Sequence, residues 1–240
     1  MPKSRNDYEY IASKVDSLRS YPFLSDKKDS YLFSVLCVKS FFYKNTDLLS
    51  DTAELSSMIV DGAYDGGVDV LFTDPSSEAC DLVIVQSKFH KTINFENAFN
   101  ALMKMANFYK DMLNGHFENV SEKVQSRFLT LYSEVGEESK IKFVLYISAP
   151  KTKISTDQLE SKFLEQFPDF SNIKLSVCFA ADIANEIKEA DSRRSTIESG
   201  KIRIDAADNI LKYGSEAVIV NVSALSMKEL YALYGTRLLV

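Results

Sequence analysis

The chain has 240 residues, of which 45% are hydrophobic and 26% charged, and its formal net charge is −6. These values are ordinary for a globular protein, and no apolar stretch is long enough to cross a membrane. Two histidines and three widely separated cysteines argue against a histidine-rich metal site, a zinc knuckle and a disulfide framework. We therefore expect a soluble protein of the reducing cytoplasm that does not contact a membrane.

The N-terminal part of the chain is predicted to be helical. Hydrophobic residues recur at helical spacing over Tyr8–Arg19, and over Ser30–Tyr43 they cover most of the circumference. Asp51 precedes a short helical segment that ends at Met58, and its side chain is placed to cap the first turn. Three helices are therefore expected before the first strand.

Two β-like segments follow, Val68–Phe72 and Leu82–Phe89. The turn-forming sequence Asp65–Gly67 precedes the first segment, and the turn-forming Asp74–Ser77 follows it. If the loop between the segments makes a hairpin, the two strands pair antiparallel.

Helices and strands alternate after this hairpin. The predicted helices are Phe95–Leu113, Ser121–Tyr132, Thr156–Phe167 and Ala181–Ala190, and the predicted strands are Ile141–Ser148 and Ile173–Phe179. Strands separated by helices at this spacing favour right-handed crossovers. The fold class is therefore α/β, with a mixed β-sheet flanked by helices on both faces.

A polar segment around Asp191–Gly200 is the candidate domain boundary. Residues 1–190 form the first predicted domain, and residues 191–240 form a linker and the start of a second. The elements predicted in the second part are a strand, Ala217–Val222, and a helix, Met227–Tyr234. Because the chain stops on three apolar residues, we expect a fragment cut inside its second domain. The apolar surface left there predicts that the region after about Asp191 packs loosely or pairs with a second copy, as a homodimer.

The residues predicted to form the catalytic site are Asp69, Gln86 and Lys88. Alternate side chains of a strand share a face, so Gln86 and Lys88 project together, and pairing with the strand of Asp69 brings all three into one cleft. Hydrolysis of a phosphodiester needs oxygen ligands for Mg²⁺ or Mn²⁺ and an oriented water molecule. Asp69, Gln86 and the backbone carbonyl of Ser87 are the predicted ligands. Lys88 is predicted to hold the water or to stabilise the transition state.

The arrangement Asp-Gly-Gly-Val-Asp over 65–69, followed by a hairpin and by Gln-Ser-Lys over 86–88, resembles the PD-(D/E)xK restriction-endonuclease-like superfamily, especially its Mrr-like members. More closely, it resembles the N-terminal region of the AIPR family, the abortive-infection phage-resistance proteins. Segment 222–238 is similar to the opening of the AIPR domain itself. The resemblance implies a restriction-endonuclease-like fold, a metal-dependent endonuclease and a role in bacterial antiviral defence.

In this resemblance Asp69 matches the metal-binding Asp, Gln86 the Glu/Gln position and Lys88 the catalytic Lys. Glutamine departs from the commoner glutamate, and a neutral amide contributes less to cation binding than a carboxylate does. A further acid is therefore expected at the metal site. In order of preference the candidates are Asp65, Asp61, Glu54 and Glu96.

The expected partner is nucleic acid, with DNA favoured over RNA, and His90 and Lys91 are candidate contacts for it. Each also has a plainer interpretation as a solvated surface residue, as Asp65 has in a turn. Two other functions stay open. One is a nuclease-like module that has lost catalysis and serves in nucleic-acid binding or oligomerisation, and metal binding would discriminate it from the enzyme. The other is a structural or sensor domain whose partner is a protein.

Overall fold

The computed structural model describes residues 6–44, 48–151, 154–170, 173–194, 210–213, 217–220 and 228. Contacts within the chain divide it into two units, 1–187 and 188–240. Every residue of the predicted site lies in the first unit. No helix among the described residues has the length and apolar character needed to cross a membrane.

A four-stranded mixed sheet forms the centre of the first unit. Its strands are β1 (Val70–Thr73), β2 (Leu82–Lys88), β3 (Ile141–Ile147) and β4 (Lys174–Cys178), in the spatial order β1-β2-β3-β4. β1 pairs antiparallel with β2, whereas the β2–β3 and β3–β4 pairs are parallel. The predicted antiparallel hairpin and mixed sheet are therefore confirmed.

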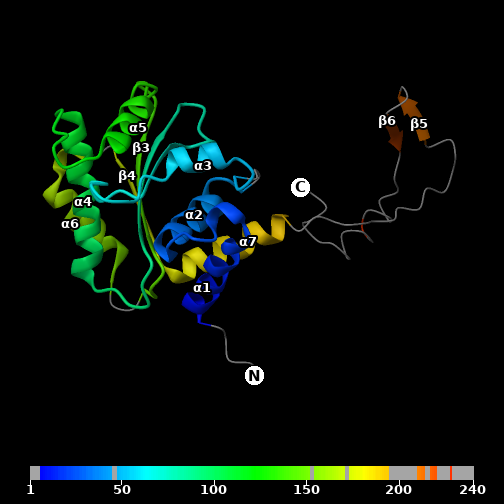
Figure 1. The fold of residues 1–240 in the computed structure, drawn as a ribbon, viewed down its shortest axis with the longest axis horizontal. Helices are drawn as coiled ribbons and strands as arrows, with labels where there is room; N and C mark the ends of the chain where they lie inside the picture. The colour runs from blue at the N-terminus through cyan, green and yellow to red at the C-terminus, as the bar shows by residue number, and fades with distance from the viewer. Residues whose placement is uncertain are drawn as a thin grey trace. The chain divides into compact units, whose positions relative to one another are not determined.

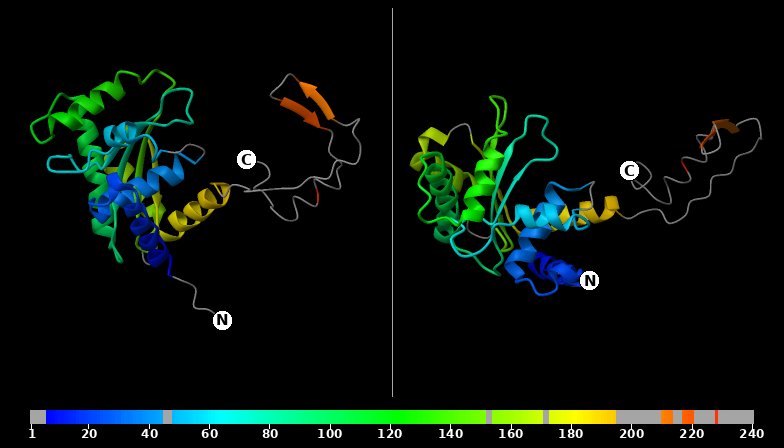
Figure 2. Two further views of the ribbon diagram at one scale, coloured as in Figure 1. Left: turned by 45° about the vertical axis from the view of Figure 1, so that its right-hand side comes forward. Right: turned by 45° about the horizontal axis from the view of Figure 1, so that its top comes forward.

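Helices cover both faces of this sheet (Figure 1). On one face lie α4 (Phe95–Leu113), α5 (Glu122–Tyr132) and α6 (Thr156–Gln166). On the other lie α1 (Asp7–Ser17), α2 (Asp29–Phe41), α3 (Thr52–Met58) and the first part of α7 (Ala180–Arg194). The described residues of this unit also form three short 3-10 helices: η1 (Leu18–Ser20), η2 (Pro22–Leu24) and η3 (Pro168–Phe170). The right-hand view of Figure 2 separates the two helical layers from another direction.

The alternation of side chains along β2 builds two cores. Leu82 and Ile84 pack with the layer of α4, α5 and α6, while Val83 and Val85 pack with the layer of α1, α2 and α3. The period of two continues to the end of the strand. Gln86 therefore faces the α4 side of the sheet, and the side chain of Ser87 faces α2, where its Oγ lies 2.5 Å from Ser34 Oγ.

Side-chain caps fix the helices that border the site. Asp51 Oδ1 accepts a hydrogen bond from the Glu54 N–H at the start of α3, as predicted. Asn94 Oδ1 accepts one from the Asn97 N–H at the start of α4. Both helices therefore begin at defined residues beside the hairpin.

The loop end of the β1–β2 hairpin is closed by an ion-pair network. Lys142 Nζ on β3 lies 2.6 Å from Asp74 Oδ2 and 2.7 Å from Asp81 Oδ2. Both aspartates are buried. Burial alone would raise the pKa of each carboxyl. The hydrogen bond and charge of Lys142, together with hydrogen bonds from Ser76 to Asp74 and from the Lys140 N–H to Asp81, outweigh burial and hold both pKa values below the ordinary one. These acids are paired.

The second unit contains one described hairpin. β5 (Ile210–Tyr213) pairs antiparallel with β6 (Ala217–Val220). β6 corresponds to the predicted strand from Ala217, whereas β5 was not predicted. The predicted helix Met227–Tyr234, apart from residue 228, and most of the segment 222–238 that resembles the AIPR domain lie outside the described residues.

Candidate metal and phosphodiester site

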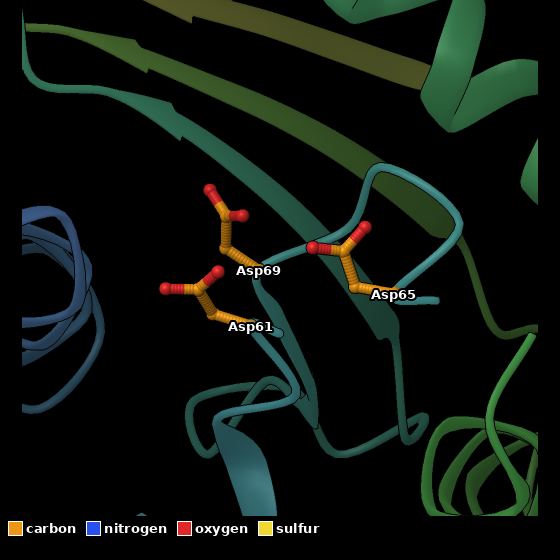
Figure 3. Close-up of side chains that lie close together, drawn as sticks. All are labelled: Asp61, Asp65 and Asp69. Atoms are coloured by element: carbon orange, nitrogen blue, oxygen red, sulfur yellow. The ribbon is translucent and has the colours of Figure 1, made fainter. Parts of the chain in front are cut away.

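Three carboxylates gather where the chain enters the sheet. Between the end of α3 and the start of β1 the chain passes Asp61, Asp65 and Asp69, and one oxygen of each lies within 4.8 Å of the others. Figure 3 shows the three side chains extending from this connection toward a common space. Asp69 is buried, Asp65 is partly buried and Asp61 is exposed. β1 begins at Val70, so Asp69 precedes the strand in which it was predicted.

Two glycines hold this connection against α4. Gly66 and Gly67 have φ angles of 68° and 83°, in the left-handed region. A Cβ on Gly66 would lie 2.5 Å from the Phe108 ring, and one on Gly67 would lie 2.7 Å from Lys104 Cβ. Asp65 Oδ1 accepts a hydrogen bond of 2.7 Å from the Gly67 N–H. Asp65 therefore serves the turn as well as the acidic cluster.

One oxygen of Asp69 collects three hydrogen bonds from β2. Asp69 Oδ2 accepts from Gln86 Nε2 at 2.9 Å, from the Ser87 N–H at 2.6 Å and from Ser87 Oγ at 2.8 Å. The strand register explains the convergence. Val70 lies opposite Val85, so one further step along the antiparallel pair brings Asp69 opposite Gln86.

The other half of the Gln86 amide has no partner. The amide must turn its NH₂ group toward the Asp69 oxygen, because an oxygen there would be repelled. Gln86 Oε1 is then left buried, and among the described residues nothing donates to it. An unpaired buried acceptor costs about 1–3 kcal/mol. A cation at the carboxylate cluster would relieve that cost, and a set of carboxylate and amide oxygens suits a hard divalent cation.

The electrostatics of the cluster oppose the ionised form of its acids. The pKa of Asp69 is raised to about 6, mainly by burial and also by the negative charge of Asp61. Hydrogen bonds from Ser87 and the positive charge of Lys88 offset part of this rise. Although the Asp61 side chain is exposed, neighbouring protein atoms partly desolvate it, and this desolvation followed by the negative charge of Asp65 raises its pKa. At neutral pH the cluster therefore concentrates negative charge that the surrounding protein only partly compensates.

A cavity of about 500 Å³ opens over the cluster. It is lined by the three aspartates together with Gln86, Ser87 and Lys88, and α1 and α2 contribute Tyr8, Asp29 and Ser30 to its wall. The structure thus brings Asp69, Gln86 and Lys88 to one cavity, as predicted.

The remaining predicted residues are placed differently. His90 lines the cavity, whereas Lys91 lies over the Tyr8 ring, with Nζ 5.7 Å from the ring centroid, and does not line it. Glu54 and Glu96, the third and fourth choices for an extra acid, belong neither to the described cluster nor to the lining of the cavity.

Two contributions to the site were not predicted from the sequence. The Ser87 hydroxyl and N–H donate to Asp69, whereas the ligand role predicted for the Ser87 carbonyl stays a prediction. Alternation along β2 already indicated that Ser87 faces away from Gln86, but not that Asp69 would reach both residues. Lys104 lines the cavity from α4. The sequence alone does not distinguish Lys104 from the other solvated lysines of a helix.

Comparisons with protein-family models, with curated proteins and with solved structures found no match to this chain.

Proposed function

We propose that this chain is a divalent-metal-dependent nuclease that hydrolyses phosphodiester bonds of nucleic acid. The observation that carries the proposal is the unpartnered, buried Gln86 Oε1 beside three clustered carboxylates in a cavity that also contains Lys88. A structural cluster would satisfy its polar atoms internally. This one leaves an unpaired acceptor and surplus negative charge among residues that line one cavity.

The proposed cofactor is Mg²⁺ or Mn²⁺, held by Asp69 and Gln86 with Asp65 and Asp61. When bound, such an ion lowers the pKa of a water ligand and polarises a phosphate oxygen. The donor set fits this assignment because it consists of oxygens alone, without histidine or cysteine. Asp61 and Asp65 supply the charge that the neutral Gln86 lacks.

The residues of the chain have separate tasks in this proposal. Ser87 orients Asp69 through two hydrogen bonds to one oxygen, which leaves Oδ1 available to a ligand. Lys88 lies close enough to Asp61 and Asp69 for its positive charge to offset part of the rise in the pKa of both. Its ammonium group can hold the attacking water or stabilise charge that develops on the phosphate.

The family resemblance extends the proposal to a restriction-endonuclease-like fold of PD-(D/E)xK type and to abortive-infection defence against phage. An antiparallel hairpin carrying Asp69 and Gln86–Lys88, followed by a long helix and a parallel strand, is compatible with that fold. The defence role rests on the sequence resemblance alone.

A catalytically inactive nuclease-like module is the second candidate. Asp69 Oδ2 already accepts three hydrogen bonds, and its pKa of about 6 leaves the carboxyl easily protonated. A site that had lost its metal could persist in this form, serving nucleic-acid binding or oligomerisation.

A cleavage assay with Mg²⁺ and Mn²⁺ on plasmid, single-stranded DNA and RNA tests the proposal. We expect cleavage by the parent and a loss of about 10²–10³-fold in Lys88→Ala, the scale of one transition-state contact. Lys110→Ala, a change at an exposed lysine of α4 outside the cavity, is the matched control. Equal cleavage by Lys88→Ala and the control contradicts the assignment of Lys88. A parent that neither binds metal nor cleaves supports the inactive module.

A further inference from the structure

A second cavity, of about 470 Å³, adjoins the acidic one. The two share three lining residues, Lys88, His90 and Lys104. The chemistry of their walls differs sharply: four aspartates line the first cavity, whereas no acidic residue lines the second.

The second cavity is built on the polar face of α4. Asn97, Asn100 and Lys104 are spaced three and four residues apart, which places them on one side of the helix. The opposite side packs into the core through residues such as Leu102 and Met105. A polar helix face is usually only solvated, but this one lines a cavity whose far wall comes from the end of β2.

Lys104 is exposed, but its stem lies against the connection that carries the acidic cluster. The absence of a side chain on Gly67 lets the acidic connection approach the Lys104 stem, because a Cβ there would lie 2.7 Å from Lys104 Cβ and 3.1 Å from its Cδ. Lys104 therefore lines both cavities, with its stem beside Gly67.

The side-chain donors of the second cavity form no ion pair within the described part of the chain. Among the described residues, ion pairs engage Lys27, Lys44 and Lys142, but neither Lys88 nor Lys104. The hydrogen bond described at Asn97 uses its backbone, not its amide side chain. The cavity offers ammonium groups, side-chain amides and a hydroxyl, and no carboxylate. Such a set of donors suits an anion rich in acceptor oxygens.

We propose that this second cavity binds the backbone phosphate next to the one cleaved, so that a nucleic-acid strand passes from the acidic cavity onto α4. The identity of the ligand rests on the proposed function. A chain of net charge −6 needs such a local cationic surface to hold a polyanion. Because the acidic cavity repels phosphate until a cation is bound, the second cavity supplies the affinity in the absence of metal.

Fluorescence anisotropy tests the site without cleavage. The probes are fluorescein-labelled oligothymidylate and oligouridylate of eight nucleotides, in EDTA. Asn100→Asp places a like charge in the cavity and should weaken binding by about tenfold or more. Its control, Asn107→Asp, adds the same charge to the exposed face of α4 about 10 Å farther along the helix axis and outside both cavities. It should stay within about twofold of the parent.

The salt dependence of the same binding identifies a phosphate contact. Lys104→Gln keeps most of the stem against Gly67 and removes the charge. The slope of log K against log salt should fall by about 0.7, the value for one phosphate contact on a single strand. Lys110→Gln should leave the slope unchanged.

The outcomes separate this proposal from the nuclease assignment. Weaker binding of either oligonucleotide by Asn100→Asp but not by Asn107→Asp supports the site, and the tighter-binding probe tells DNA from RNA. Equal binding by the two variants, or an unchanged slope in Lys104→Gln, overturns it. Calorimetric Mn²⁺ titration of the same proteins reports on the acidic cavity alone. In a further outcome, the parent binds the oligonucleotides in a way that Asn100→Asp weakens and yet takes up no metal. That result removes the nuclease assignment and keeps the phosphate site.

Discussion

The two ends of the β1–β2 hairpin both contain buried aspartates, but the pKa of these aspartates is shifted in opposite directions. At the loop end, Asp74 and Asp81 share the Lys142 ammonium, and their pKa values are lowered. At the other end, Asp69 lies beside two further acids, and its pKa is raised to about 6. Acids that are fully paired within the protein belong to its structure. Acids that are left uncompensated in a cavity are available to a ligand.

The largest difference is expected when the lysine of each end is removed. Lys142→Met leaves two buried carboxylates without their partner and should lower the free energy of unfolding by about 3 kcal/mol or more. Lys88→Met should change it by less than about 1 kcal/mol, because Lys88 is partly exposed and pairs with no carboxylate among the described residues. Urea unfolding at neutral pH measures both. Similar losses in the two variants would show that the ends do not differ.

Asp69→Asn should not destabilise the metal-free protein. All three donors converge on one oxygen of Asp69, and the single amide oxygen of asparagine can accept from them. Because the folded-state pKa is raised, the acid stabilises the fold at low pH and loses that contribution as the pH rises through about 6. At pH 8 the variant is therefore expected to be more stable by up to about 2 kcal/mol. A thermal melt in EDTA that shows a clear loss contradicts this.

Gln86→Glu should have a smaller effect, seen mainly in metal affinity. The change places a carboxylate at a position where the resembling superfamily often has one, and about tenfold tighter Mn²⁺ binding corresponds to 1.4 kcal/mol. The added charge should lower the stability of the metal-free protein, since it joins three other acids. Calorimetry and a melt in EDTA measure the two effects, and weaker metal binding would place Gln86 outside the ligand set.

Acidification should affect the loop end modestly. Because the pKa values of Asp74 and Asp81 are lowered in the folded protein, their stabilising contribution is present above their ordinary pKa, near 4, and is lost as the pH falls through the lowered values. Urea midpoints between pH 5 and 2 should therefore fall more steeply for the parent than for Asp81→Asn. Parallel curves would mean that this ion pair does not contribute.

Local sequence signals predicted most of the fold. The bounds of α4 were predicted to the residue, because an apolar stripe runs from Phe95 to Leu113 and Asn-Gly follows it. The cleft of Asp69, Gln86 and Lys88 followed from strand alternation and hairpin spacing. The hydrogen bonds from Ser87 and the place of Lys104 could not be predicted. They depend on how the chain turns at Asp69 and how closely Gly67 approaches α4, and both are tertiary contacts.

Calorimetric titration of Mn²⁺ into the parent, Asp69→Asn and Asp81→Asn tests the central claim most directly. The proposed metal site predicts that the parent and Asp81→Asn bind the ion with equal affinity and that Asp69→Asn does not bind it, while all three stay folded. Absence of binding to the parent, or unchanged binding by Asp69→Asn, would contradict the assignment of the acidic end of the hairpin as a metal site.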